Sequence, residues 1–94
     1  MFVLHVDLKL KPASGRELER VFEDTFRPAI SRQEGFRAVT LLRAQEQKDS
    51  YVLSIVFDDQ SLQQKWVATA LHQEVWPQME SHCASYAVKS YEAV

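Results

Sequence analysis

Residues 51–79 read YVLSIVFDDQSLQQKWVATALHQEVWPQM, and this stretch contains the features on which the fold prediction depends. Residues 51–57 are β-branched, aliphatic or aromatic on both alternating faces, around a single serine. Such a pattern is typical of a strand that is covered on both sides. Asp58 and Asp59 then interrupt the apolar run and are good helix caps. We therefore predict a buried strand that leads directly into a helix.

The helical region after this strand contains both tryptophans and one of the three histidines. Its start is either a cap at 58–59 or a capping box formed by Ser61 and Gln64. The apolar residues fall on two rows that change over near residues 70–72, which predicts a bend there. Pro77 predicts a further interruption or restart.

The remaining segments alternate between strand and helix patterns. Ser14 and Glu17 are spaced as a capping box, so a helix should begin there. Pro28 lacks a backbone donor and should kink or thin the last turn of that helix. A polar turn at 45–50 joins two strands as a hairpin. The predicted strands are residues 2–11, 36–44, 51–57 and 86–92.

The resulting order, β-α-β-β-α-β, predicts an α+β fold of the ferredoxin-like type, with a four-stranded antiparallel sheet and both helices on one face. Two helices cover only one side of such a sheet, yet the strands at 36–44 and 51–57 are apolar on both sides. The simplest cover for the second side is the same face of another copy. We therefore predict a homodimer in which two sheets pack as a dimeric α/β barrel around an enclosed space.

Length and composition place further bounds on the protein. The 94 residues predict one domain, residues 1–94, and the net charge of −2 with scattered basic residues argues against nucleic-acid binding. No apolar run is long enough to span a bilayer, and the N-terminus alternates with charge, so we expect a cytoplasmic protein. Cys83 is the only cysteine and no Cys/His cluster has zinc-ligand spacing, so no metal site is predicted.

Four short sequence features follow one another along the chain. The first is Lys-Pro after the first strand (11–12), and the second is Glu-Gly-Phe at the start of a strand that ends in Leu-Leu-Arg (34–43). The third is a Tyr-Val-Leu strand that ends in an aromatic residue and two acids (51–59), and the fourth is a helix with tryptophan and histidine (66–72). In this order and spacing, most of the chain resembles the antibiotic biosynthesis monooxygenase family of dimeric α/β barrels.

The resemblance implies oxidation of small aromatic phenols, quinols or polyketide-like molecules by molecular oxygen without a cofactor, in a family that also has a heme-degrading branch. Members of both kinds often have an asparagine on the first strand, but this sequence contains none and has Val6 and Asp7 in that region. The axial histidine of heme-degrading members lies about three helical turns beyond the tryptophan. Trp76 occupies that place here.

The candidate catalytic residues are His72, Trp66 and His5. Trp66 matches the family pattern, although a helical tryptophan usually fills core. His72 is either an exposed helix histidine or a proton acceptor, because imidazole titrates near neutral pH. His5 lies beside Asp7 on the face of the first strand that points away from the helices. Both are predicted to enter the barrel cavity, and a polar strand edge is the alternative interpretation.

The candidate substrate-binding residues are Tyr51, Phe57, Asp7 and Arg37. Tyr51 and Phe57 would shape the cavity and stack on an aromatic ring. Arg37 shares a strand with Arg43, and these arginines would either hold an anionic group or lie at the rim.

Two function classes follow from these residues. The first is a cofactor-independent monooxygenase in which His72 or His5 accepts a proton from a phenol or quinol, whose anion then passes an electron to oxygen. The second is a non-catalytic module that binds a small ligand and dimerises through the same cavity. A heme-degrading monooxygenase is the third and weaker alternative.

We expect the purified protein to be colourless and free of metal, because the sequence has one cysteine, no clustered histidines and a tryptophan where heme-degrading relatives carry the axial ligand. An absorption spectrum and elemental analysis of untreated protein check this expectation. A stoichiometric Soret band or tightly held iron would favour the heme-degrading branch instead.

Overall fold

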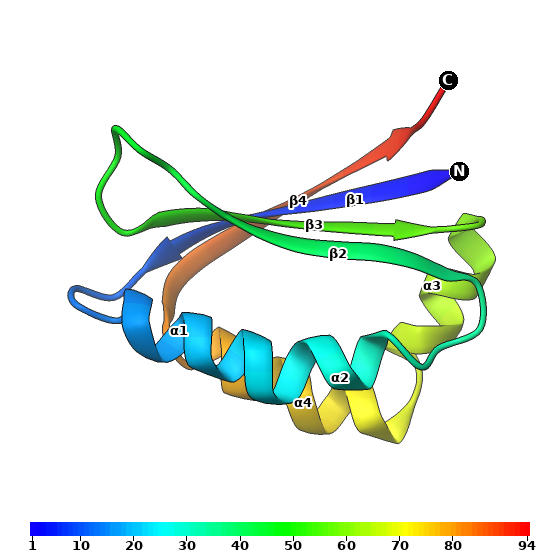
Figure 1. Cartoon of the computed structure of the whole chain (residues 1–94), viewed down its shortest axis with the longest axis horizontal. Helices are drawn as coiled ribbons and strands as arrows, with labels where there is room; N and C mark the ends of the chain where they lie inside the picture. The colour runs from blue at the N-terminus through cyan, green and yellow to red at the C-terminus, as the bar shows by residue number, and fades with distance from the viewer.

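The computed structural model describes all residues, 1–94, and contains one four-stranded antiparallel sheet (Figure 1). The strands lie in the spatial order β2-β3-β1-β4. Their bounds are β1 Phe2–Leu10, β2 Phe36–Arg43, β3 Ser50–Phe57 and β4 Cys83–Glu92. The helical segments are α1 Gly15–Val21, η1 Phe22–Phe26, α2 Arg27–Ile30, α3 Gln60–Val67 and α4 Ala70–Glu80. None of these helices is long and apolar enough to cross a membrane.

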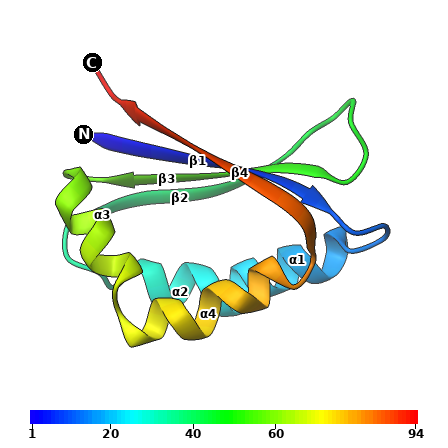
Figure 2. The same cartoon turned by 180° about the vertical axis from the view of Figure 1, so that it is seen from behind.

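All helices lie on one face of the sheet, as both views of the molecule show (Figures 1 and 2). The predicted ferredoxin-like α+β fold is therefore confirmed, including the order of its elements. β1 is central and pairs with β3 on one side and β4 on the other. β2 pairs with the far side of β3, so β2 and β4 form the two edges of the sheet.

The core lies between the sheet and the helices. Alternating residues of β1 and β3 point toward the helices, and the inward row of β3, from Tyr51 to Phe57, is buried throughout. Fully buried side chains come from every layer, so the helices and the sheet share one apolar cluster. The largest of these side chains are Trp66, Phe26, Phe57, Leu8, Leu18, Ile30, Leu53 and Met79.

The helix starts differ in how well the sequence predicted them. Asp59 caps α3 by accepting a hydrogen bond from the Leu62 backbone N–H at 3.0 Å, which confirms the first of the two alternatives. The capping box at Ser14 is wrong, because its side chain forms no cap hydrogen bond. The backbone of Ser14 is already helical (φ −95°, ψ −3°) rather than extended, so its hydroxyl is not directed at the first helical N–H groups.

The two prolines within the helices, Pro28 and Pro77, have different effects. The turn before Pro28 widens into a π-helical segment, since the Arg27 N–H bonds to the Phe22 carbonyl five residues back. The last turn, Arg27–Ile30, is regular α-helix, so the predicted thinning of that turn is wrong and the irregularity lies one turn earlier. Pro77 does not interrupt α4, contrary to the prediction. The carbonyl four residues before Pro77 belongs to Gln73, and both residues are exposed, so that carbonyl is accessible to solvent and its lost helical bond does not end the helix.

Two element boundaries moved relative to the sequence prediction. The bend expected near residues 70–72 lies slightly earlier, because α3 ends at Val67 and Thr69 caps a separate helix. β4 begins at Cys83, three residues before the predicted start at 86, because Cys83 pairs with Leu10 at the end of β1. Long-range pairing of this kind extends a strand beyond its local pattern.

The outer face of the sheet, which points away from the helices, is partly apolar. Val52 and Val56 are half-buried there although no helix covers them. Leu42 on the neighbouring strand is exposed, and it pairs with Val52. These side chains form an apolar strip over β2 and β3.

We expect the protein to be a homodimer through this strip, because burial of its valines against a second copy removes apolar surface from water. Sedimentation equilibrium at micromolar concentration should give twice the chain mass of 10.9 kDa. Val52→Lys should give a folded monomer, because it would bury two like charges across the interface. Gln78→Lys, an exposed site on α4, is the matched control and should stay dimeric. A stable wild-type monomer would remove the basis for a shared cavity between two sheets.

Candidate functional site

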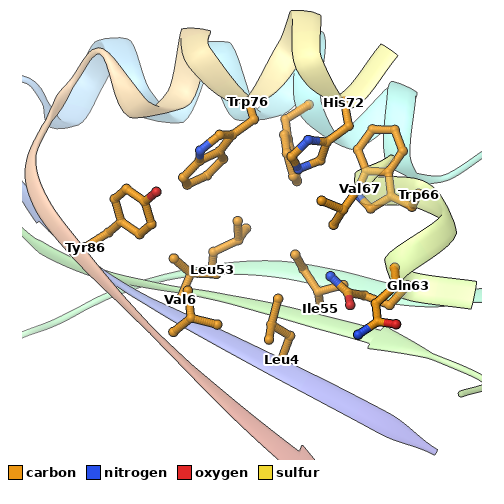
Figure 3. A pocket seen from close by; sticks show the side chains of 13 residues that line it. Leu4, Val6, Leu53, Ile55, Gln63, Trp66, Val67, His72, Trp76 and Tyr86 are labelled. Carbon is orange, nitrogen blue, oxygen red and sulfur yellow. The ribbon is translucent and has the colours of Figure 1, made fainter. Parts of the chain in front are cut away.

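A cavity of about 420 Å³ lies between the inner face of the sheet and helices α3 and α4 (Figure 3). Small-molecule sites have volumes of about 300–1,000 Å³ and are mostly apolar. Ten of the 13 lining residues are hydrophobic, and none carries a permanent charge. The lining residues are Leu4, Val6, Phe26, Leu53, Ile55, Gln63, Gln64, Trp66, Val67, His72, Trp76, Tyr86 and Val88.

Trp66 and His72 meet in this cavity because the helical region is interrupted between them. Thr69 adopts an extended backbone (φ −74°, ψ 152°), which ends α3 and starts α4 in a new direction. Its hydroxyl donates to the Trp66 carbonyl at 2.7 Å and accepts from the His72 backbone N–H at 3.1 Å. The two rings pack edge to face, with centroids 5.1 Å apart. The bend predicted to bring this pair together is therefore present.

An aromatic wall continues from this pair toward the open edge of the sheet. Phe26 packs edge to face on both Trp66 and Trp76, at centroid distances of 6.2 and 6.4 Å. Trp76 in turn contacts Tyr86 of β4 at 5.3 Å. The Tyr86 and Val88 side chains remain 43% and 52% exposed, because the helices do not extend over this edge strand. The cavity therefore opens beside β4.

His72 is the only titratable group besides Tyr86 that lines the cavity. Burial lowers the pKa of its imidazole below the ordinary value of 6.5, so the ring is neutral at physiological pH. Its Nδ1 is the only buried side-chain nitrogen or oxygen in the chain that lacks a hydrogen-bond partner. Nε2 is thus the ring nitrogen that a ligand can reach, and a neutral imidazole there can accept a proton.

The other predicted site residues do not line this cavity, which lies on the helix side of the sheet, whereas the predicted barrel cavity would lie on the outer face between two sheets. His5 and Asp7 lie on the outer face of the sheet, where His5 packs on Tyr91 at a centroid distance of 5.0 Å. Phe57 faces inward but is fully buried in the core, against Phe36. Arg37 is exposed and pairs with Asp58.

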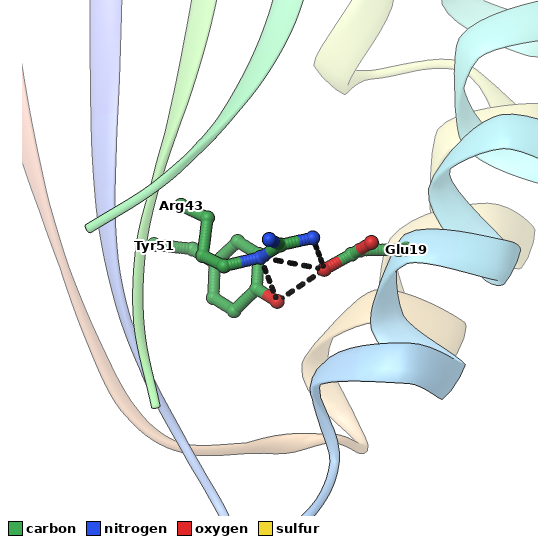
Figure 4. A network of polar contacts seen from close by, with 3 residues as sticks. All are labelled: Glu19, Arg43 and Tyr51. Carbon is green, nitrogen blue, oxygen red and sulfur yellow. Dashed lines mark hydrogen bonds and ion pairs between the residues drawn. The ribbon is translucent and has the colours of Figure 1, made fainter. Parts of the chain in front are cut away.

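Tyr51 belongs to a separate polar network at the far end of the sheet (Figure 4). Its hydroxyl donates to the Glu19 carboxylate, which also accepts from Arg43 at 2.8 Å. The hydrogen bond from Tyr51 and the one from Arg43 lower the pKa of Glu19, while burial raises the pKa of Tyr51. A Cβ on Gly15 would lie 2.8 Å from the Tyr51 hydroxyl, so a larger residue there would displace that hydroxyl from the network. These contacts tie the β2–β3 hairpin to α1.

Of the 13 lining residues, sequence reasoning named only Trp66 and His72 as site residues, and the polar or aromatic ones that it missed include Gln63, Trp76 and Tyr86. Gln63 lies three residues before Trp66, which places both on the same face of α3, and that spacing was a usable signal. Trp76 and Tyr86 could not be paired from local patterns, because their contact depends on how β4 returns alongside α4.

The fold and the cavity define a class of protein, namely ferredoxin-like α+β domains with an apolar pocket between sheet and helices. A sequence model of the family described as antibiotic biosynthesis monooxygenase matches residues 1–77, so the chain belongs to that family. No curated protein sequence matches the chain.

Solved structures show the same fold at low sequence identity. SnoaB, a cofactor-independent oxygenase from Streptomyces nogalater, has a TM-score of 0.84 at 24% identity, with coverage of 99% of this chain and 93% of SnoaB. A Bordetella bronchiseptica protein provisionally described as an antibiotic biosynthesis monooxygenase has a TM-score of 0.88 at 19% identity, covering 99% and 97%. A Caulobacter crescentus protein described in the same way has a TM-score of 0.87 at 19% identity, covering 99% and 89%.

We expect His72 to make folding stability depend on pH. Because its folded-state pKa is depressed, the unfolded chain binds the proton first as pH falls below 6.5, and the free energy of unfolding then decreases. His72→Ala should remove this component, so the stability of wild type minus that of the variant should fall on acidification. Urea unfolding of both proteins at a series of pH values measures the difference. Parallel pH curves for the two proteins would contradict the burial of this imidazole.

Proposed function

We propose that the protein is a cofactor-independent monooxygenase that oxidises a small phenol, quinol or polyketide-like aromatic in the cavity between sheet and helices. The observation that carries this proposal is the neutral imidazole of His72 in an aromatic, uncharged cavity. Membership of the monooxygenase family and the likeness to a cofactor-independent oxygenase support the same function.

The first step requires a base, and we assign that role to His72 because its imidazole lines the cavity. Nε2 accepts the proton of the phenolic hydroxyl, and the phenolate that forms is a much better electron donor than the phenol. The lowered pKa keeps the imidazole unprotonated near neutral pH, which is the state that a general base needs. The apolar walls exclude water and leave the anion poorly solvated, which favours electron transfer out of it.

The overall reaction balances without any other reductant. A phenol with a free ring position opposite its hydroxyl gives up four electrons and becomes a quinone. Dioxygen accepts those four electrons, and one of its atoms forms the new ring carbonyl while the other leaves as water. Trp66 and Trp76 would hold the flat ring by stacking and edge-to-face contacts.

Oxygen-uptake measurements with a panel of hydroxylated aromatics test this proposal. The wild type should consume one dioxygen for each quinone formed, at a rate that rises with pH through the depressed pKa of His72. His72→Ala should lower kcat by about 10²–10⁴-fold, the usual contribution of a general base. Trp66→Phe should keep the reaction but weaken binding by about 1 kcal/mol, the scale of one aromatic pair.

His82→Ala is the matched control, because His82 is also half-buried but lies outside the cavity. It should leave the rate unchanged. Binding of the aromatics by wild type without any oxygen uptake would contradict the proposal and favour the non-catalytic ligand-binding module.

A further inference from the structure

Gln63 differs from other glutamines of the chain in having a buried side chain without a partner. It is only 7% exposed, and it lines the cavity from α3. The side-chain amides of Gln33, Gln73 and Gln78 each donate to a backbone carbonyl. The Gln63 side chain forms no hydrogen bond within the chain, and its backbone N–H donates to the Asp59 carbonyl at 3.4 Å.

The Gln63 amide opens into the cavity. Because His72 Nδ1 is the only fully enclosed polar side-chain atom without a partner, the amide atoms of Gln63 are not sealed inside the protein. A primary amide offers two donors and one acceptor, and an apolar site makes it costly to leave them unpaired. The group is therefore poised to bond to whatever enters the cavity.

The charge of the cavity restricts what that molecule can be. No aspartate, glutamate, lysine or arginine lines it, and the imidazole of His72 is neutral near physiological pH. An anionic or cationic ligand would lose its hydration without gaining a counter-ion, which costs several kcal/mol per charge. The cavity therefore selects uncharged molecules.

We propose that Gln63 is a specificity-determining residue whose side-chain amide donates a hydrogen bond to a ketone oxygen of an uncharged, flat hydroxyketone. Figure 3 shows Gln63 and His72 entering the cavity from different helices, with Trp66 and Val67 between them. A ligand with a phenol at one point of its ring system and a ketone at another pairs with both groups at once. The assignment of the phenol to His72 rests on the proposed function, whereas the ketone contact does not.

Two probes isolate the ketone contact. One is a hydroxytetralone, which carries a phenol and a ketone on one fused bicycle, and the other is the tetrahydronaphthol that lacks only the ketone. The chain has two tryptophans, Trp66 and Trp76, and both line the cavity, so quenching of their fluorescence reports binding directly. Wild type should bind the hydroxytetralone about 10-fold more tightly, the effect of one hydrogen bond in an apolar site.

Gln63→Met keeps the length of the side chain and removes the amide. It should bind both probes equally, with the affinity of wild type for the tetrahydronaphthol, and should melt near the wild-type temperature because the amide makes no hydrogen bond within the chain that the substitution could remove. Gln60→Met, an exposed site on the same helix, is the matched control and should retain the 10-fold preference. Gln63→Glu, which offers no donor when ionised, should disfavour the ketone probe further.

Three results would overturn the assignment: a preference that persists in Gln63→Met, an equal loss of affinity for both probes, or no binding of either probe by wild type. Failure of the proposed oxidation is separable from these results. A preference that depends on Gln63, without oxygen uptake on any hydroxylated aromatic, would leave the specificity role in place and remove only the monooxygenase reaction.

Discussion

The hydroxyl of Thr69 makes the two hydrogen bonds on which the arrangement of the cavity depends. By donating to the Trp66 carbonyl it terminates one helix, and by accepting from the His72 N–H it starts the next. A cap of this kind contributes about 1 kcal/mol. Its larger effect is geometric, because six residues of continuous helix would direct Trp66 and His72 to different faces.

The sheet explains why a cavity exists beside this break. The helices pack over β1, β2 and β3, whose inward side chains are buried, but they leave the inner side of β4 open at Tyr86 and Val88. Two large tryptophans of the helical layer contact this region without filling it. The core and the cavity therefore share one wall, and Trp66 belongs to both, with only 2% of its surface exposed. A residue in this position cannot be changed for function without some effect on packing.

The two ends of the molecule divide structural and chemical roles between them. At the end of the molecule that contains Tyr51, the side chains of Glu19, Tyr51 and Arg43 hydrogen-bond to one another and hold the β2–β3 hairpin against α1 (Figure 4). In the cavity, His72 Nδ1 and the Gln63 amide have no partner within the chain. Buried polar groups normally find partners, so the Gln63 amide and the accessible Nε2 of His72 mark the place where a ligand interacts, whereas Nδ1 is enclosed.

The sequence by itself determined the features that short-range physics controls. Alternation identified the strands at 2–11 and 51–57 and the inner face of the first of them. Asp58–Asp59 identified the helix start, and the change of apolar rows identified the break that unites Trp66 with His72. Only the tertiary structure decided which side chains share the cavity. Tyr51, Leu53, Ile55 and Phe57 alternate onto the same inward side of β3, yet only Leu53 and Ile55 line the cavity. Strand register and the position of the helices over the sheet decide this, and both are set by partners distant in sequence. His5 and Asp7 lie on the face away from the helices, as their phase predicted. A residue's phase selects a side of the sheet, and long-range packing selects what covers that side.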